Sequence, residues 1–187
     1  MKLKAILANA STLILIVILT GALQNASAQK VYATKTGQIY FNATGALEKI
    51  AAVNNQVDSK FVDATGQIIF GVLIKGFKFE NQLMEDHFNE NYMESTKFPK
   101  ADFKGYIINI KEINFSKDGA YPIQVEGVLT IHGVSQKINT KGTISIAQGK
   151  ATIEGGFSVK VKDYGITGLY IGEKIANEAT IKLNCKY

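Results

Sequence analysis

The sequence predicts an all-β protein, a closed antiparallel barrel of about eight strands with one short helical segment as a lid. Apolar and polar residues alternate with a period of two through the second half of the chain, and the turns between these segments are too short for crossover helices. Only one segment has helical spacing. A sheet with one apolar face must be covered, and because the chain has almost no helix to cover it, we expect the sheet to close on itself.

Four successive segments carry the clearest alternation. They start with YPIQVEGVLTIHG and QKINTKGTISIA, continue after a Gln148-Gly149 turn, and end at the C-terminus. Their apolar positions are Ile123, Val125, Leu129 and Ile131, then Ile138, Ile144 and Ile146, then Ala151, Ile153, Phe157, Val159 and Val161, and finally Ile175, Ala179, Ile181, Leu183 and Cys185. Polar side chains occupy the positions between them, so we expect an antiparallel meander with one apolar and one wet face.

The strands of the first half are less regular. They are expected at residues 31–41, 57–63, 68–79 and 103–115. The third of these, IIFGVLIKGFKF, is apolar on both faces, and Gly76 is a candidate β-bulge at which the facing switches. Residues 46–55 stay unassigned, because ALEKIAAV fits either a helical turn or a bent strand.

The segment with helical spacing is residues 81–93. It has Leu83, Met84, His87, Phe88 and Tyr92 on one side and acidic or amide side chains on the other, which is interpreted as a solvated face. The surrounding apolar surplus also includes Phe77, Phe79, Met93, Phe98 and Phe103. Core packing accounts for most clusters of this kind. Here the helix is inserted between two strands, where a lid over a barrel mouth would lie, and this favours an internal cavity.

The first 28 residues have the pattern of a secretory signal peptide, with Lys2 and Lys4 before an apolar block from Ala5 to Ala22 and the small residues Ala26 and Ala28 after it. A membrane anchor is the alternative, because the block is nearly long enough to span a bilayer. The small residues follow at once, however, without a basic stop-transfer cluster. We therefore expect one barrel domain at residues 29–187, periplasmic or secreted, with no stable membrane anchor after cleavage.

The composition excludes several classes of function. All 21 basic residues are lysines, so the bidentate donor that nucleic-acid and phosphate sites favour is absent, and we expect no nucleic-acid partner. Cys185 is the single cysteine, which excludes an internal disulfide. Its place on an apolar face predicts a buried, unreactive thiol.

The two histidines are the candidates for a metal or catalytic site. His87 is surrounded in sequence by acidic residues, but at helical spacing only Glu90 is its neighbour. His132 falls on the outward parity of its strand, and a transition-metal site would need both histidines to converge. We therefore expect no metal, and His87 is interpreted as structural, bonded to the backbone or to a carboxylate at the barrel mouth. The chain has no nucleophile elbow or Gly-rich phosphate loop, so no catalytic residue is assigned.

Three blocks of the sequence together resemble a known family. They are FENQLMEDHFNENYMESTKFPKADFKG, VEGVLTIHGVSQKI and VKVKDYGI. The chain is similar to the YceI-like proteins, which are bacterial, mostly periplasmic, lipocalin-like barrels that bind a polyisoprenoid chain in their interior. The resemblance puts His87, Phe88, Asn89, Tyr92, Glu94, Ser95, Phe98 and Pro99 in the family's mouth segment, and Thr130, Ile131, His132 and Gly133 in its central strand motif. The tryptophan often found in the family's first strand is missing.

The resemblance implies an exported, non-catalytic protein that holds a polyisoprenoid or similar long-chain apolar molecule for transport, storage or sequestration. The expected ligand-binding residues are Ile69, Leu73, Phe77, Phe79, Leu83, Met84, His87, Phe88, Tyr92, Phe98, Phe103, Val125, Leu129, Ile131, Phe157 and Val159. A chain of about 40 carbons, at roughly 0.3 kcal/mol per atom, supplies about 12 kcal/mol without an ionic contact. No cofactor beyond such a ligand is expected, and a homodimer is left open.

Two other classes of function stay open. One is an enzyme that acts on an isoprenoid or lipid-like substrate in the cavity, with His87 or a nearby acid as proton donor. The other is a barrel with a fully packed core that serves as an interaction or stress protein. A polar group on the inward face would favour the enzyme, and the absence of a cavity would favour the packed barrel.

Overall fold

The computed structural model describes residues 29–187, and the signal peptide expected at residues 1–28 lies outside them. Within residues 29–187, eight strands of seven or more residues follow one another. They are β1 (Val31–Thr44), β2 (Ala51–Val62), β3 (Gln67–Leu73), β5 (Lys100–Ile107), β6 (Gly119–Ile131), β7 (Val134–Ala147), β8 (Lys150–Lys160) and β9 (Ile175–Lys186). The short β4 (Lys78–Phe79) and the helix α2 (Gln82–His87), which a π-helical turn (Phe88–Tyr92) continues, lie between β3 and β5.

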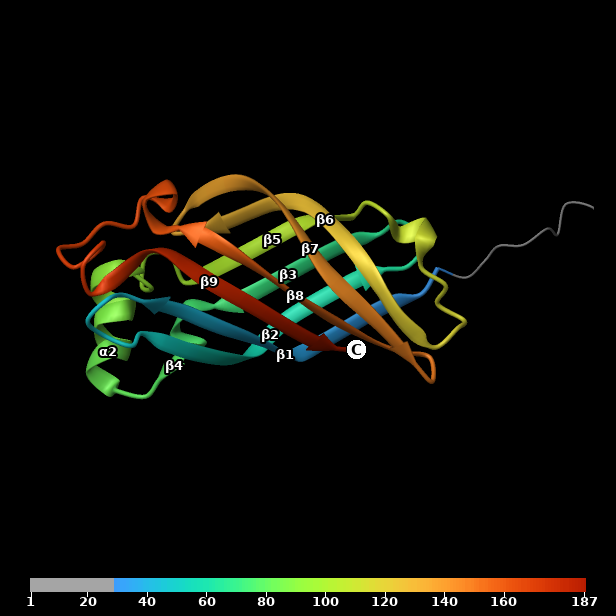
Figure 1. The fold of residues 1–187 in the computed structure, drawn as a ribbon, viewed down its shortest axis with the longest axis horizontal. Helices are drawn as coiled ribbons and strands as arrows, with labels where there is room; N and C mark the ends of the chain where they lie inside the picture. The colour runs from blue at the N-terminus through green and yellow to red at the C-terminus, as the bar shows by residue number, and fades with distance from the viewer. Residues whose placement is uncertain (1–28) are drawn as a thin grey trace, which may run out of the picture.

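The eight strands close into an antiparallel barrel, as predicted. The order around the barrel is β1-β9-β8-β7-β6-β5-β3-β2, and the pairing of β2 with β1 closes the barrel. β4 extends the edge of β2, where Phe79 pairs with Ala52. Figure 1 shows an elongated barrel with α2 at one end. None of the helices in residues 29–187 is long and apolar enough to cross a membrane.

Two tight hairpin turns set the register of the meander. Gln148 and Gly149 join β7 to β8 with φ values of 51° and 74°, and His132 and Gly133 join β6 to β7 with φ values of 51° and 75°. Positive φ at both central residues is the geometry of a type I′ turn, whose twist matches that of the flanking strands. His132 is therefore a turn residue, and the sequence-based placement of its side chain on the outer face of a strand is wrong.

The end of the barrel away from α2 is packed with aromatic rings. The rings of Tyr32 and Phe61 stack with their centroids 4.4 Å apart, and Phe61 meets the edge of Tyr187 at 5.0 Å and packs on Phe115 at 6.1 Å. Tyr187 is held in this group by a 2.6 Å hydrogen bond between its hydroxyl and that of Ser59. We call these four rings the aromatic plug. They come from four separate parts of the chain, so the plug fastens both termini of the domain to its core.

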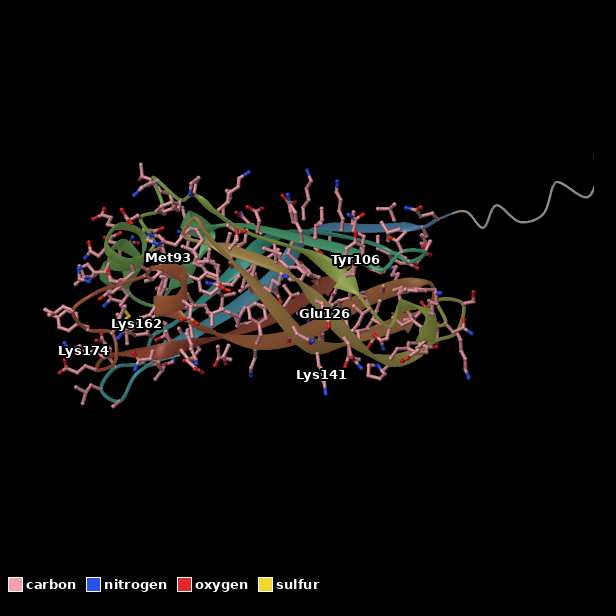
Figure 2. The ribbon with its side chains drawn as sticks, turned by 90° about the horizontal axis from the view of Figure 1, so that it is seen from above. Met93, Tyr106, Glu126, Lys141, Lys162 and Lys174 are labelled. Carbon is pink, nitrogen blue, oxygen red and sulfur yellow. The ribbon has the colours of Figure 1, made fainter. Side chains whose placement is uncertain are left out.

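The β1–β2, β3–β5, β6–β7 and β8–β9 connections lie at the opposite end, where α2 is (Figure 1). Asn81 caps the helix by accepting a 2.8 Å hydrogen bond from the backbone N–H of Leu83. Lys49, in the β1–β2 connection, forms a 3.0 Å ion pair with Glu80 just before the helix. A 3₁₀ turn (Val161–Tyr164) begins the β8–β9 connection. In Figure 2 the labels of Lys162 and Lys174 lie at this end, whereas Tyr106, Glu126 and Lys141 lie along the outer wall.

Residues 68–79 do not form one strand. β3 ends at Leu73, a 3₁₀ turn (Ile74–Gly76) follows, and this turn rather than a bulge at Gly76 switches the inward parity. The expected strand 103–115 ends at Ile107, and residues 51–55, left unassigned above, belong to β2. The helical segment is shorter than expected, because a π-helical turn replaces its second half.

Candidate ligand cavity

An internal cavity of about 150 Å³ lies between the α2 end and the packed core. Nearly all of its lining is aliphatic or aromatic. The lining residues are Ile39, Phe41, Phe70, Gly71, Val72, Ile74, Phe77, Phe88, Met93, Ala101, Asp102, Phe103, Val125, Leu129, Ile131, Ile138, Thr140, Phe157, Val159, Val161, Tyr164, Ile166, Ala179, Ile181 and Leu183. A cavity with such a lining favours an apolar guest, because water inside it would find few hydrogen-bond partners.

The lid of the cavity is centred on Phe88, the first residue of the π-helical turn. Its ring packs against those of Phe79 at 5.0 Å, Phe41 at 5.5 Å and Phe77 at 5.7 Å. Met93, at the end of the same turn, is buried and lines the cavity as well. A π-helical turn is an uncommon element that often occurs at functional sites. Here it turns Phe88 inward while the preceding helix keeps an exposed outer face.

The lid segment is tied to two other connections through His132. Nε2 of His132 lies 2.8 Å from Oε2 of Glu94, and Nδ1 lies 3.3 Å from the backbone oxygen of Tyr164. The ring also packs on Phe98 with a centroid distance of 4.4 Å. A carboxylate and a carbonyl oxygen both accept hydrogen bonds, so each ring nitrogen of His132 faces an acceptor. His132 therefore joins the lid, the β6–β7 turn and the β8–β9 connection.

One wall of the cavity contains a seam between β7 and β8. Their backbone ladder runs from the hairpin turn to Gly142 and Gly155 and ends there, although both strands continue toward the α2 end. Beyond that point two side-chain bonds hold the strands: Thr140 Oγ1 donates to the oxygen of Gly156 at 2.9 Å, and Gln136 Nε2 donates to the oxygen of Asp163 at 3.0 Å. Ile138 and Thr140 on one side of the seam and Phe157 on the other are half-buried residues of the cavity lining.

Two tyrosines at the α2 end of the barrel, Tyr92 and Tyr164, have raised pKa values. Burial raises the pKa of Tyr164, and Asp163 raises it further. Burial also raises the pKa of Tyr92, with smaller contributions from Tyr170 and Glu48. Both phenols therefore keep their protons at neutral pH. In the described part of the chain no cluster of three His, Cys, Asp or Glu side chains is placed to bind a metal.

Eight of the expected ligand-binding residues line the cavity. They are Phe77, Phe88, Phe103, Val125, Leu129, Ile131, Phe157 and Val159. Of the remaining eight, Phe79 packs behind Phe88 and Phe98 packs on His132, while Met84 and Tyr92 are half-buried in the lid segment outside the lining. Whether the eight lining residues bind a ligand stays a prediction.

The expectation that Ile69, Leu73 and Leu83 line the cavity is wrong. Their side chains are 37%, 48% and 60% exposed on the outside of the barrel. The pairing of β3 with β5 explains why Ile69 and Leu73 face outward. Phe70 is opposite the inward-facing Phe103, and residues opposite each other in an antiparallel ladder share a face. Even positions of β3 therefore face inward. Leu83 lies on the solvent side of α2.

His87 is exposed, and its ring makes no hydrogen bond to any residue of the described chain. The structural role expected for it, a bond to a carboxylate at the mouth, belongs to His132 instead. Glu85 also departs from the interpretation of the acidic residues as a solvated face, because it is 8% exposed and ion-paired with Lys78.

The expected ligand-binding residues left out lining residues on five strands. They are Ile39 and Phe41 on β1, Phe70, Gly71 and Val72 on β3, Ala101 and Asp102 on β5, Ile138 and Thr140 on β7, and Ala179, Ile181 and Leu183 on β9. The alternation of β9 contained the necessary signal, since those residues lie on its apolar face. β1 carried a weaker signal, because polar residues interrupt its alternation.

A closed antiparallel barrel with a short lid and an apolar cavity defines a lipocalin-like class of protein. The chain belongs to the YceI-like domain family, whose model matches residues 23–187. No curated protein sequence matches it.

Two solved structures share the fold. BcnA of Burkholderia cenocepacia is 15% identical over 81% of this chain and 96% of its own, with a TM-score of 0.67. A polyisoprenoid binding domain from Saccharophagus degradans, implicated in plant cell wall breakdown, is 11% identical over 85% of this chain and 98% of its own, with a TM-score of 0.71. At these identities the comparison shows a common fold.

Proposed function

We propose that the protein binds a polyisoprenoid or similar apolar chain in the barrel and transports, stores or sequesters it without catalysis. The observation that carries this proposal is the cavity itself, which the ring of Phe88 covers on one side and that of Phe103 limits on the other. Membership of the YceI-like family supports it, as does the fold shared with a polyisoprenoid binding domain.

The energetics of such binding follow from the lining. Each methylene group transferred from water into an apolar site gains about 0.8 kcal/mol. Because the lining offers almost no polar partner, affinity depends on buried hydrocarbon rather than on a head group. A polar head group would stay at the mouth, where the neutral phenols of Tyr92 and Tyr164 lie near the lid and the β8–β9 connection.

The proposal is tested by filling the cavity. Leu129 lines the cavity and is 6% exposed, whereas its neighbour Val128 is 39% exposed on the outer face. We expect Leu129→Trp to lose the apolar molecules that mass spectrometry finds in an organic extract of the purified protein, while Val128→Trp keeps them. Melting temperatures of both variants report on the fold, since overpacking typically costs about 1–3 kcal/mol.

The outcome that contradicts the proposal is a wild-type protein that neither carries nor binds an apolar chain, together with a Leu129→Trp variant that melts far lower. Such a result would identify a packed core and favour the interaction or stress protein considered above.

The enzyme alternative gains no support from His87 or the acids near it. Its proposed proton donor, His87, is exposed on the lid segment and does not line the cavity. The acids nearest the lid are engaged elsewhere: Glu85 pairs with Lys78, and Glu94 contacts His132.

The proposal includes export to the periplasm or cell exterior, with cleavage before Gln29. The support is the sequence pattern of residues 1–28. Mass analysis of the protein recovered from outside the cytoplasm should give a chain that begins at Gln29. A recovered chain that retains the apolar block would make the protein membrane-anchored instead.

A further inference from the structure

We infer that the cavity accepts an apolar segment of only about 6–15 carbons, and that Phe103 sets this limit by forming the floor of the cavity. The inference deepens the proposed function and rests on it. It names a ligand with a short or medium-length apolar chain, in place of the chain of about 40 carbons considered from the sequence.

The first step is the size of the cavity. A water molecule needs roughly 10–15 Å³ of cavity volume. The cavity of about 150 Å³ therefore has room for about 10–15 groups the size of a water molecule or a methylene. An engineered apolar cavity of about the same volume in another protein binds benzene, which gives the lower end of the range. A fully enclosed chain of about 40 carbons would exceed this space severalfold.

The second step is the floor. The ring of Phe103 lies over Gly105 and Gly127, which pair with each other on β5 and β6. A Cβ atom added at Gly105 or Gly127 would lie 2.6 Å or 2.5 Å from Cζ of Phe103, so the ring occupies the space that two side chains would otherwise take. Phe70 packs beside Phe103 at a centroid distance of 6.1 Å. Because Gly105 and Gly127 have no side chains, the ring of Phe103 has room to lie across the barrel interior.

The third step is what lies beneath the floor. Ile68, Ile107 and Ile123 are at most 2% exposed, and the aromatic plug follows them toward the far end. A chain that enters from the α2 end therefore cannot run the length of the barrel without displacing packed side chains. The remainder of a longer chain has to lie outside, at the mouth or along the seam, where it stays in contact with water and adds little affinity.

Chain-length dependence tests the inference. Isoprenoid alcohols from about 5 to about 40 carbons are competed against Nile red bound to the delipidated protein. Affinity should rise about fourfold for each added carbon up to about 15 carbons and then level off. A steady rise to about 40 carbons would overturn the limit. Failure of every length to bind would instead overturn the proposed function, so the two failures are distinguishable.

Substitution of the floor tests the role of Phe103. Phe103→Leu opens space above Gly105 and Gly127, and the affinity should level off at a longer chain. The matched control is Phe115→Leu, which makes the same change in the aromatic plug and should leave the levelling point where it is in the wild type. A Phe103→Leu protein that is folded by circular dichroism but keeps the wild-type levelling point would show that Phe103 is not the floor. Phe103→Met provides a second, milder variant should Phe103→Leu fail to fold.

Discussion

Oε2 of Glu94 lies 2.8 Å from Nε2 of His132, and this contact fastens the end of the lid segment to the turn between β6 and β7. The side chain of His132 is only 11% exposed, while that of Glu94 is 46% exposed. Glu94 holds a backbone φ of 42°, an uncommon value for a residue with a side chain. The contact, the strained backbone and the packing of Phe98 on the imidazole together fix the position of the lid over the cavity.

We expect Glu94→Gln to loosen the lid. The change keeps the shape of the side chain but replaces the carboxylate that contacts Nε2 of His132 with an amide, and a partly exposed contact of this kind contributes about 1 kcal/mol. Urea unfolding should show that loss, hydrogen exchange should rise in residues 88–99, and a bound apolar probe should dissociate faster. Glu90→Gln, at an exposed position of the same segment, is the control. Equal effects of the two substitutions would show that the contact does not hold the lid.

Neither histidine is expected to hold a metal. His87 is exposed, and both ring nitrogens of His132 already face protein acceptors. After incubation with zinc and dialysis, elemental analysis should find background metal in the wild type and no change in His87→Ala or His132→Ala. Stoichiometric zinc in the wild type that is lost on either substitution would contradict this interpretation.

The sequence predicted the closed barrel and the inward face of β6, β8 and β9, because those strands have one apolar and one polar face. Val125, Leu129, Phe157 and Val159 accordingly line the cavity where they were expected. Periodicity is sufficient when only one register buries the apolar set.

The sequence could not settle β3 in the same way. Ile68, Ile69, Phe70, Val72 and Leu73 are all apolar, so either parity would bury a hydrophobic face. Pairing with β5 decides between the two, and that pairing brings together parts of the chain that no local pattern connects. The contact between Glu94 and His132 is equally non-local. It depends on the positive φ of the turn residues His132 and Gly133, and the alternating sequence pattern predicted a continuous strand at His132 instead.

Asn54 is a buried polar residue that the alternation did not single out. It is 0% exposed, its Nδ2 donates to the oxygen of Leu73 at 3.0 Å, and its Oδ1 accepts from the N–H of Gln56 at 2.8 Å. It thereby bridges β2 to the end of β3, beyond the point where their ladder ends at Asp58 and Gly71.

We expect Asn54→Ala to destabilise the fold by about 1–3 kcal/mol, because it removes two part-buried hydrogen bonds, those to the oxygen of Leu73 and from the N–H of Gln56, each worth about 0.5–1.5 kcal/mol. Asn55→Ala removes an exposed side chain next to it and should cost less than about 0.5 kcal/mol. Chemical denaturation of both variants measures the difference. Similar midpoints for the two would mean that the bridge contributes nothing.

Cys185 gives the last prediction, a dependence of stability on alkaline pH. Its thiol is 0% exposed and packs beside Ser59 and Tyr187, and burial raises its pKa from 9.0 to about 11. Burial likewise raises the pKa of Tyr187. A raised pKa means that the folded state keeps the proton more tightly than the unfolded state, so the stabilisation is complete below pH 9 and is lost as the pH rises toward about 11.

A shift of this size corresponds to about 2–3 kcal/mol of stability that the wild type should lose between those two pH values. Cys185→Ala removes the thiol, and its stability should therefore fall less over the same range. Contributions common to both proteins cancel in the difference between their urea unfolding free energies. Cys185 also raises the pKa of Tyr187, so part of the difference is transmitted through that phenol. Parallel curves for the wild type and Cys185→Ala from pH 8 to pH 11 would show that the thiol is not held in its protonated form by the fold.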